Sequence, residues 1–275
     1  MKLRSAIELL EKAGVDSPDT DAFILAEHFC GISKSSAKFS LEKDITDRGF
    51  LDAVARRSKR EPLQYILGRW YFMNEEYLVS PDCLIPRPET ELLTEKVIKL
   101  LPENGVLLDL CCGSGCIAIS SLAARKDCRA IAVDLFPATI DIAKKNAELN
   151  SVNDRIEFLK SDVTDANAQK PTEKFDVIVS NPPYIRTDVL ETLEPELFHE
   201  PAAALDGGED GLIFYRSIIS DWSKLLKDDG TILFEIGYDQ GKDLLSIANE
   251  NNMTCKIIKD FSGLDRIALV KRKVI

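Results

Sequence analysis

The residues best suited to chemistry are Asn181, Pro182, Pro183 and Tyr184, which directly follow an apolar run at 175–180. The run predicts a buried parallel strand, and polar residues at the carboxyl end of such a strand lie where α/β sheets bind ligands. The two prolines fix φ and remove two N–H donors, so a stiff turn presents carbonyl oxygens and the Asn181 amide to a cleft. Two acceptors of this kind can hold an NH2 group and aim its nitrogen at an electrophilic methyl. Taken alone, the tetrapeptide suits an ordinary proline turn equally well.

A second candidate site lies upstream, between a predicted strand at 106–110 and a predicted helix from residue 116. The tight loop between them consists of Cys111, Cys112, Gly113, Ser114 and Gly115. Glycines let the backbone approach a ligand closely, and a helix N-terminus adds a positive dipole. The next predicted strand, 130–133, ends in Asp134, whose carboxylate can accept hydrogen bonds from both hydroxyls of a ribose. The pattern predicts a nucleoside-binding half-site.

The loop by itself leaves two cofactor classes open, because Gly113, Gly115 and Ala118 also match the dinucleotide fingerprint. Asp109 ends the first strand, where we expect it to meet a cationic amino group. Together with the Asn-Pro-Pro-Tyr turn, it favours S-adenosylmethionine over a nicotinamide cofactor. A third acid, Asp162, precedes Val163 after a predicted strand at 156–159, where an adenine amino group needs an acceptor. Its alternative interpretation is a helix or turn cap.

These residues resemble the release-factor glutamine methyltransferases of the HemK/PrmC family, which methylate N5 of a glutamine amide with S-adenosylmethionine. The resemblance runs nearly end to end. Besides the Asn-Pro-Pro-Tyr turn it includes the blocks EPLQYILG at 61–68, LIPRPETE at 84–91, EP at 200–201 and ALDGGEDGL at 204–212. Sister enzymes that methylate a ribosomal-protein glutamine usually depart from the PRPETE form, so the block favours release factors as substrates.

The resemblance implies that S-adenosylmethionine, with S-adenosylhomocysteine as product, is surrounded by the 111–115 loop, Asp134, the edge at 162–163 and Asn181. It implies that the Asn181 side-chain oxygen and the Pro182 carbonyl hold the target amide, with Tyr184 around the glutamine. No general base is then required, because alignment and acceptor dipoles can supply several kcal/mol. Cys111 and Cys112 depart from the family's loop, which commonly begins with glycine. We expect a small effect, provided that φ of Cys111 stays negative.

Composition agrees with a protein substrate. The chain has 275 residues, enough for two domains, and a net charge of -11, which argues against broad nucleic-acid binding and favours a basic partner. Seven cysteines without regular spacing are typical of a reducing cytosol, and no apolar run approaches a membrane span. The cluster of Cys111, Cys112 and Cys116 lacks a second CxxC pair. We therefore expect a cytoplasmic enzyme without a metal site or a membrane anchor.

The pattern of elements predicts an α/β protein with a small helical domain at 1–69, in which Ser17 and Pro18 begin a helix and Gly31 ends it. Residues 70–85 predict a β-hairpin linker whose aromatic residues pack between domains. From residue 86 to 275 strands and helices alternate, as in a doubly wound Rossmann-like methyltransferase domain. Segments 255–258 and 266–270 predict an antiparallel edge pair.

The acid-rich stretch 190–211 predicts a loop over the active site. Glu200 or Glu209 is a candidate contact for the partner, although solvated surface acids are the stronger interpretation. Our hypothesis is that the helical domain and this loop together recognise a class-I release factor and place its Gly-Gly-Gln glutamine beside Tyr184. The alternatives are methylation of a ribosomal-protein glutamine, methylation of a flipped-out DNA adenine at N6, and a nucleotide-binding adaptor without activity.

Overall fold

The computed structural model describes residues 1–273; Val274 and Ile275, at the end of the predicted 86–275 domain, lie outside the described residues. The chain forms two compact units. One consists of Met1–Arg69 together with Glu194–His199, and the other of Trp70–Leu193 together with the chain from Glu200 onward. Each unit is described by itself.

The first unit is built from short helices. They are α1 (Leu3–Lys12), α2 (Pro18–Cys30), α3 (Lys34–Ala37), α4 (Arg48–Arg57), α5 (Leu63–Leu67) and the 3-10 helix η2 (Pro195–His199). Helix α2 begins at Pro18 and ends before Gly31, whose φ of 65° is the left-handed conformation that glycine adopts readily. Helix α4 begins after Asp47, whose side chain accepts a hydrogen bond from the Phe50 N–H. The start of α2 and its end before Gly31 agree with the sequence prediction.

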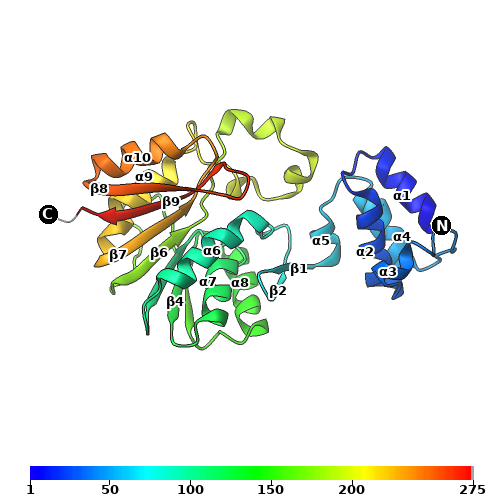
Figure 1. Cartoon of the computed structure of the whole chain (residues 1–275), viewed down its shortest axis with the longest axis horizontal. Coiled ribbons are helices and arrows are strands. Elements are labelled where there is room, and N and C mark those ends of the chain that lie inside the picture. Colours follow the sequence, from blue (N-terminus) through cyan, green and yellow to red (C-terminus); the bar gives the residue numbers. More distant parts are fainter. Residues whose placement is uncertain (274–275) are drawn as a thin grey trace. The chain divides into compact units, whose positions relative to one another are not determined.

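The second unit contains a seven-stranded sheet in the order β5-β4-β3-β6-β7-β9-β8, and the two-stranded hairpin β1-β2 (Figure 1). The strands are β1 (Arg69–Phe72), β2 (Glu75–Leu78), β3 (Val106–Leu110), β4 (Arg129–Asp134), β5 (Ile156–Lys160), β6 (Phe175–Ser180), β7 (Leu226–Glu235), β8 (Met253–Lys259) and β9 (Asp265–Arg272). Strands β3 to β7 are parallel, and β9 pairs antiparallel with both β7 and β8. The predicted doubly wound sheet with an antiparallel edge pair is confirmed.

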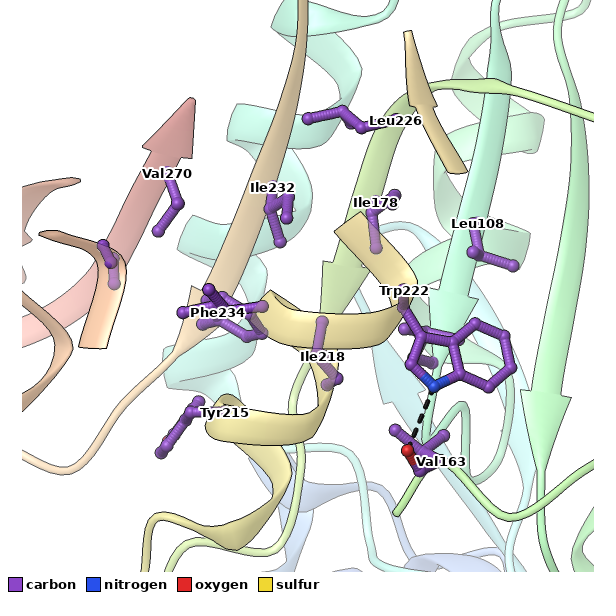
Figure 2. Packing of buried hydrophobic residues seen from close by; sticks show 14 of the residues in the cluster. Leu108, Val163, Ile178, Tyr215, Ile218, Trp222, Leu226, Ile232, Phe234 and Val270 are labelled. Carbon is purple, nitrogen blue, oxygen red and sulfur yellow. Dashed lines mark hydrogen bonds between the residues drawn. The ribbon is translucent and has the colours of Figure 1, made fainter. Parts of the chain in front are cut away.

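Helices cover both faces of this sheet (Figure 1). They are α6 (Pro88–Leu100), α7 (Cys116–Ala124), α8 (Pro137–Leu149), α9 (Ile213–Asp221) and α10 (Gly241–Glu250), with the 3-10 helices η1 (Thr187–Thr192), η3 (Ala202–Ala204) and η4 (Trp222–Leu225). Successive strand residues face opposite sides, so Leu107 joins the core layer beneath α6 and α7 while Leu108 joins the layer beneath α9. Figure 2 shows this second layer, in which Tyr215, Ile218 and Trp222 pack against the strands.

The hairpin aromatics correct one prediction. Phe72 and Tyr77 are fully buried in the core layer of the second unit, and the Tyr77 hydroxyl lies 2.6 Å from Ser120 Oγ. These two side chains therefore anchor the hairpin to the sheet domain instead of packing between domains. The hydrophobicity of these side chains predicts that they are buried, but it does not specify which part of the protein buries them.

The predicted loop at 190–211 is divided between the units. Residues 194–199 belong to the helical unit, whereas residues from Glu200 onward belong to the sheet unit. Ile185 pairs with the returning chain, donating its N–H to the Leu205 carbonyl at 2.9 Å and accepting from the Gly207 N–H at 2.7 Å. Within residues 1–273, no helix has the length and apolar character that crossing a bilayer requires.

Candidate active site

A cavity of about 310 Å³ lies in the sheet unit beside the carboxyl ends of β3 to β6. This is the point where the strand order reverses, between β3 and β6, and open α/β sheets bind ligands there. The predicted site residues that line it are Cys111, Cys112, Gly113, Ser114, Asp134, Asp162, Val163, Asn181 and Pro183. Asp109, Gly115, Pro182 and Tyr184 were also predicted, and they are not among the lining residues.

The loop after β3 has three residues in the left-handed region, at φ values of 58° for Cys111, 55° for Gly113 and 80° for Gly115. The condition for a small effect, a negative φ at Cys111, is therefore not met. The chain turns sharply from β3 into α7, and the loop uses a left-handed residue at the place where the family commonly has glycine. A non-glycine residue in this conformation costs about 1–2 kcal/mol. Burial raises the pKa of the Cys111 and Cys112 thiols well above the ordinary value, so both are neutral.

Asp134 ends β4 with its side chain facing the loop. Its Oδ2 accepts the Gly113 N–H at 3.0 Å, and its Oδ1 accepts the Phe136 N–H at 3.1 Å. Burial raises the pKa of Asp134 above its ordinary value, and the backbone N–H groups oppose this shift. Each carboxylate oxygen has a second lone pair, so the group can still accept hydrogen bonds from a ligand diol.

Asp162 follows β5, the next strand of the sheet. Its Oδ1 accepts both the backbone N–H and the hydroxyl of Thr164, at 2.8 and 2.7 Å. Asp162 therefore caps a turn, as one interpretation held, and it also lies on the cavity wall. The adjacent Val163 carbonyl accepts the Trp222 indole N–H at 3.0 Å (Figure 2) and the Ser217 hydroxyl at 2.6 Å. Helix α9 and the residue that follows it thus fix this edge of the cavity.

Asp109 lies apart from the cavity wall. Alternation along β3 directs its side chain toward α7, where it is fully buried and Oδ2 accepts the Ala118 N–H at 3.1 Å. Its Oδ1 has no partner among the described residues, and burial raises its pKa to about 8. A contact between Asp109 and a cofactor amino group stays a prediction.

The Asn-Pro-Pro-Tyr turn follows β6, and Asn181 is its residue on the cavity wall. Asn181 Nδ2 donates to Thr90 Oγ1 at 3.1 Å, and Thr90 Oγ1 donates to Glu235 Oε2 at 2.7 Å. Because Nδ2 is directed to α6, Oδ1 is the amide atom available to a ligand. Prolines contribute no N–H, so the polar groups of this turn are mainly acceptors.

The backbone of the turn is held from two sides. Gln240, which is 8% exposed, donates its Nε2 to the carbonyls of Tyr184 at 3.0 Å and Gly211 at 3.2 Å. Gly207 packs directly on the turn, since a Cβ there would lie 2.7 Å from Tyr184 Cα and 2.9 Å from the Pro183 carbonyl oxygen. A Cβ at Gly211 would lie 2.5 Å from the Tyr184 carbonyl oxygen. The glycines of the 204–212 block therefore allow close backbone approach to the turn.

Glu200 is not a solvated surface acid, which corrects the stronger of the two interpretations offered for it. Its side chain is 1% exposed and forms an ion pair with the Arg87 guanidinium. Its Oε2 also accepts the Ile85 N–H at 3.0 Å. Two blocks that are far apart in the sequence, 84–91 and 200–201, therefore join beside the cavity, and Glu200 has a structural contact instead of a free carboxylate.

Three residues of the site were missed as functional candidates: Thr90, Glu235 and Gln240. Thr90 lies in the quoted PRPETE block, but nothing in the block indicates its partner. For Glu235 the available signal was an acid in the apolar strand segment at 232–236, since a buried acid needs partners. Gln240 directly precedes α10, and nothing in its sequence context indicates a role in the site.

The residues on the wall suit a nucleoside-bearing ligand. Two carboxylates lie at the ends of neighbouring strands, and the 111–115 loop exposes backbone next to them. Leu135 and Phe136, which are 41% and 45% exposed, add apolar surface beside Asp134. No triad of metal-ligating side chains is found among residues 1–273. Fold and site together define a Rossmann-like methyltransferase of the class that uses S-adenosylmethionine.

Comparison with known proteins gives the family. The family model described as "Methyltransferase small domain" matches residues 88–228, and "PrmC N-terminal domain" matches residues 2–68. A protein of Caulobacter vibrioides named "Release factor glutamine methyltransferase" is 36% identical, covering 96% of this chain and 93% of the relative. Proteins of the same name from Agrobacterium fabrum and Aquifex aeolicus are 36% and 35% identical over 98% and 92% of this chain, and over 96% and 90% of their own lengths. The chain belongs to the release factor glutamine methyltransferase family.

Solved structures agree on the fold alone. A methyltransferase from Pyrococcus furiosus has a TM-score of 0.54 at 22% identity, covering 72% of this chain and 89% of that chain. A ribosomal protein L11 methylase from Lactobacillus delbrueckii subsp. bulgaricus has a TM-score of 0.52 at 21% identity, covering 71% and 84%. Both similarities support the methyltransferase architecture.

Proposed function

We propose that this protein transfers a methyl group from S-adenosylmethionine to N5 of the glutamine in the Gly-Gly-Gln motif of class-I peptide chain release factors. The observation that carries the proposal is the orientation of Asn181: its Nδ2 is bound to Thr90, so its Oδ1 is directed at whatever enters the cavity. An acceptor there suits a substrate that presents an NH2 group. The names of the full-length relatives support the release factor as that substrate.

The residues of the cavity have separate roles in this proposal. Asp134 accepts the ribose hydroxyls, and the Asp162–Val163 edge accepts the adenine amino group. The 111–115 loop lies along the rest of the cofactor, and Asp109, behind this loop, is the acid predicted to meet the cofactor's amino group. S-adenosylmethionine, when bound, supplies an electrophilic methyl on a sulfonium. This chain supplies alignment and exclusion of water.

The substrate amide is held by acceptors only. Asn181 Oδ1 and the Pro182 carbonyl each accept one hydrogen of the glutamine NH2, which directs the nitrogen lone pair toward the cofactor. Tyr184 packs around the glutamine side chain. The net charge of -11 favours a basic protein partner over a nucleic-acid backbone. Release factors act in the cytoplasm, so the proposal places the enzyme there.

The test is incubation of the purified protein with S-adenosylmethionine and a bacterial class-I release factor, followed by peptide mass spectrometry. The expected result is one added methyl on the Gly-Gly-Gln glutamine, and none on a Gln→Ala variant of the factor. Methyl transfer to a ribosomal protein glutamine or to DNA adenine, with the release factor left unmodified, would replace this proposal by the corresponding alternative.

A further inference from the structure

A chain of buried polar side chains lies beneath the Asn-Pro-Pro-Tyr turn. Glu235 ends β7 and is 2% exposed, and Thr90, on α6, is also 2% exposed. Glu235 lies on the same face of β7 as Leu233, the face covered by α6, which brings it to Thr90 across 145 residues of sequence. Asn181 completes the chain from the cavity wall.

The chemistry of these groups fixes the direction of each hydrogen bond. An ionised carboxylate only accepts, so the single Thr90 hydroxyl proton is directed to Glu235 Oε2. The Thr90 oxygen can then only accept from Asn181, and the Asn181 atom that can donate is Nδ2. Consequently Oδ1 is the atom left facing the cavity. The opposite amide orientation would place an NH2 group against the NH2 of a substrate amide.

The same Glu235 carboxylate also acts on Tyr184, the last residue of the turn. The Tyr184 side chain is among the groups that lower the Glu235 pKa. Burial raises the pKa of Tyr184, and the Glu235 charge adds to this effect, so the phenol is a neutral donor. Tyr184 and Glu235 therefore lie close enough for each to shift the pKa of the other.

We propose that Glu235 and Thr90 are positioning residues for the substrate amide: the carboxylate fixes the Thr90 proton, and Thr90 fixes the Asn181 amide with Oδ1 toward the substrate. This inference rests on the proposed function, because only a substrate with an amide NH2 needs an acceptor at that place. A fixed acceptor does not reorganise at the moment of transfer, and reorganisation is a cost that preorganised polar groups avoid.

Protonation of Glu235 would remove the constraint. A neutral carboxyl can donate to Thr90 Oγ1, which frees the Thr90 proton for Asn181 Oδ1. Burial raises the pKa of Glu235 to about 7, opposed by the Thr90 hydrogen bond and by Arg266 on β9, with Glu89 of α6 raising it further. The Tyr215 hydroxyl of α9 donates to the Glu235 backbone carbonyl. A raised pKa means that the neutral form accumulates as the pH falls below about 7, so turnover decreases on that side.

The experiment compares Glu235→Gln, Thr90→Val and Thr90→Ser in the full-length protein with a class-I release factor as substrate. Thr94→Val is the matched control, since Thr94 is buried one turn further along α6 and donates to the Thr90 backbone carbonyl at 3.1 Å, outside the network. We expect kcat to fall by about 10-fold to 100-fold in Glu235→Gln and Thr90→Val. KM and S-adenosylhomocysteine affinity stay within about threefold, and Thr90→Ser and Thr94→Val keep most of the rate. The decrease of kcat below about pH 7, which is the acid limb of the pH profile, disappears in Glu235→Gln.

A second readout does not depend on turnover. Nitrogen-15 NMR measures the exchange of the Asn181 side-chain amide hydrogens with solvent, and Asn181→Ala assigns their signals. We expect slow exchange in the wild type and in Thr94→Val, and faster exchange in Thr90→Val. Equal kcat values for Thr90→Val and Thr94→Val, or an unchanged acid limb in Glu235→Gln, would overturn the inference while leaving glutamine methylation intact. Absence of methylation by the wild type would count against the proposed function, and the exchange rates would still decide the positioning role.

Discussion

Cys111 is a non-glycine residue on the cavity wall with a positive φ. Its φ of 58° is in the left-handed region, whereas its buried neighbour Cys112 does not have a positive φ. The residue pattern could indicate the loop but not the sign of φ, because that sign is set by how β3 and α7 pack. Asp134, Asp162 and Asn181 were predictable because each lies at or just after the end of a strand, and the carboxyl ends of parallel strands meet at one edge of the sheet.

Substitutions at this position test the strain. A β-branched residue is strongly disfavoured at positive φ, so Cys111→Val should lower the free energy of unfolding by about 2 kcal/mol, whereas Cys111→Gly should change it by less than about 1 kcal/mol. Cys112→Val has the same volume change at a residue without positive φ, and it should cost at least about 1 kcal/mol less than Cys111→Val. Urea denaturation gives the values, and equal effects of valine at both positions would show that the backbone is not strained.

At the scale of elements, the site depends on a contact between the loop at 204–212 and the turn after β6. The sequence blocks indicated that both segments are special, but their mutual contact is tertiary and left no local signal. The same holds for Thr90 and Glu235, which belong to α6 and β7 and meet only when the sheet is assembled. Strand and helix positions were predictable from hydrophobic patterning, because the spacing of apolar residues shows which face of a helix or strand is buried.

Gly207→Ala tests this contact. The added Cβ would lie 2.7 Å from Tyr184 Cα, so the turn must shift, and we expect kcat to fall by about 100-fold, as a displacement of the order of 1 Å can cost that much. Cofactor affinity should stay near the wild-type value, since Gly207 does not line the cavity.

The control for that variant is Gly208→Ala. Gly208 has a φ of 89°, but a Cβ there would meet nothing closer than 3.5 Å, so it carries backbone strain without contact with the turn. Steady-state kinetics and calorimetric titration with S-adenosylhomocysteine compare the two variants. An equal loss of kcat in both would attribute the effect to the loop as a whole.

At the scale of the whole molecule, the chain leaves the sheet unit after Leu193, contributes residues 194–199 to the helical unit, and returns at Glu200. In the helical unit Glu196 accepts hydrogen bonds from Arg57 at 2.9 Å and from Arg60 at 2.6 Å, and Arg57 also pairs with Asp21 at 2.7 Å. The Arg57 side chain is 8% exposed. A run of basic residues such as 56–60 ordinarily forms a solvated face, but the carboxylate partner of these two arginines lies 136–139 residues away in the sequence.

Glu196→Ala should therefore destabilise the helical unit by about 2 kcal/mol, because it removes the carboxylate partner of Arg60 and leaves the largely buried Arg57 paired with Asp21 alone. Proteolysis at 190–200 should become faster, and methylation of an intact release factor should slow more than methylation of a short Gly-Gly-Gln peptide. Glu194→Ala is the matched control, since Glu194 is an exposed acid in the same segment. Indistinguishable proteolysis and stability in the two variants would show that the Glu196 ion pairs do not anchor the segment.

The central claim is that Asn181 holds a substrate amide for methylation, and the most direct measurement is kcat of Asn181→Ala with a class-I release factor at saturating S-adenosylmethionine. Removing one preorganised acceptor should lower kcat by about 100-fold to 1,000-fold, with methylation still confined to the Gly-Gly-Gln glutamine. Retention of the wild-type kcat in Asn181→Ala would contradict the account.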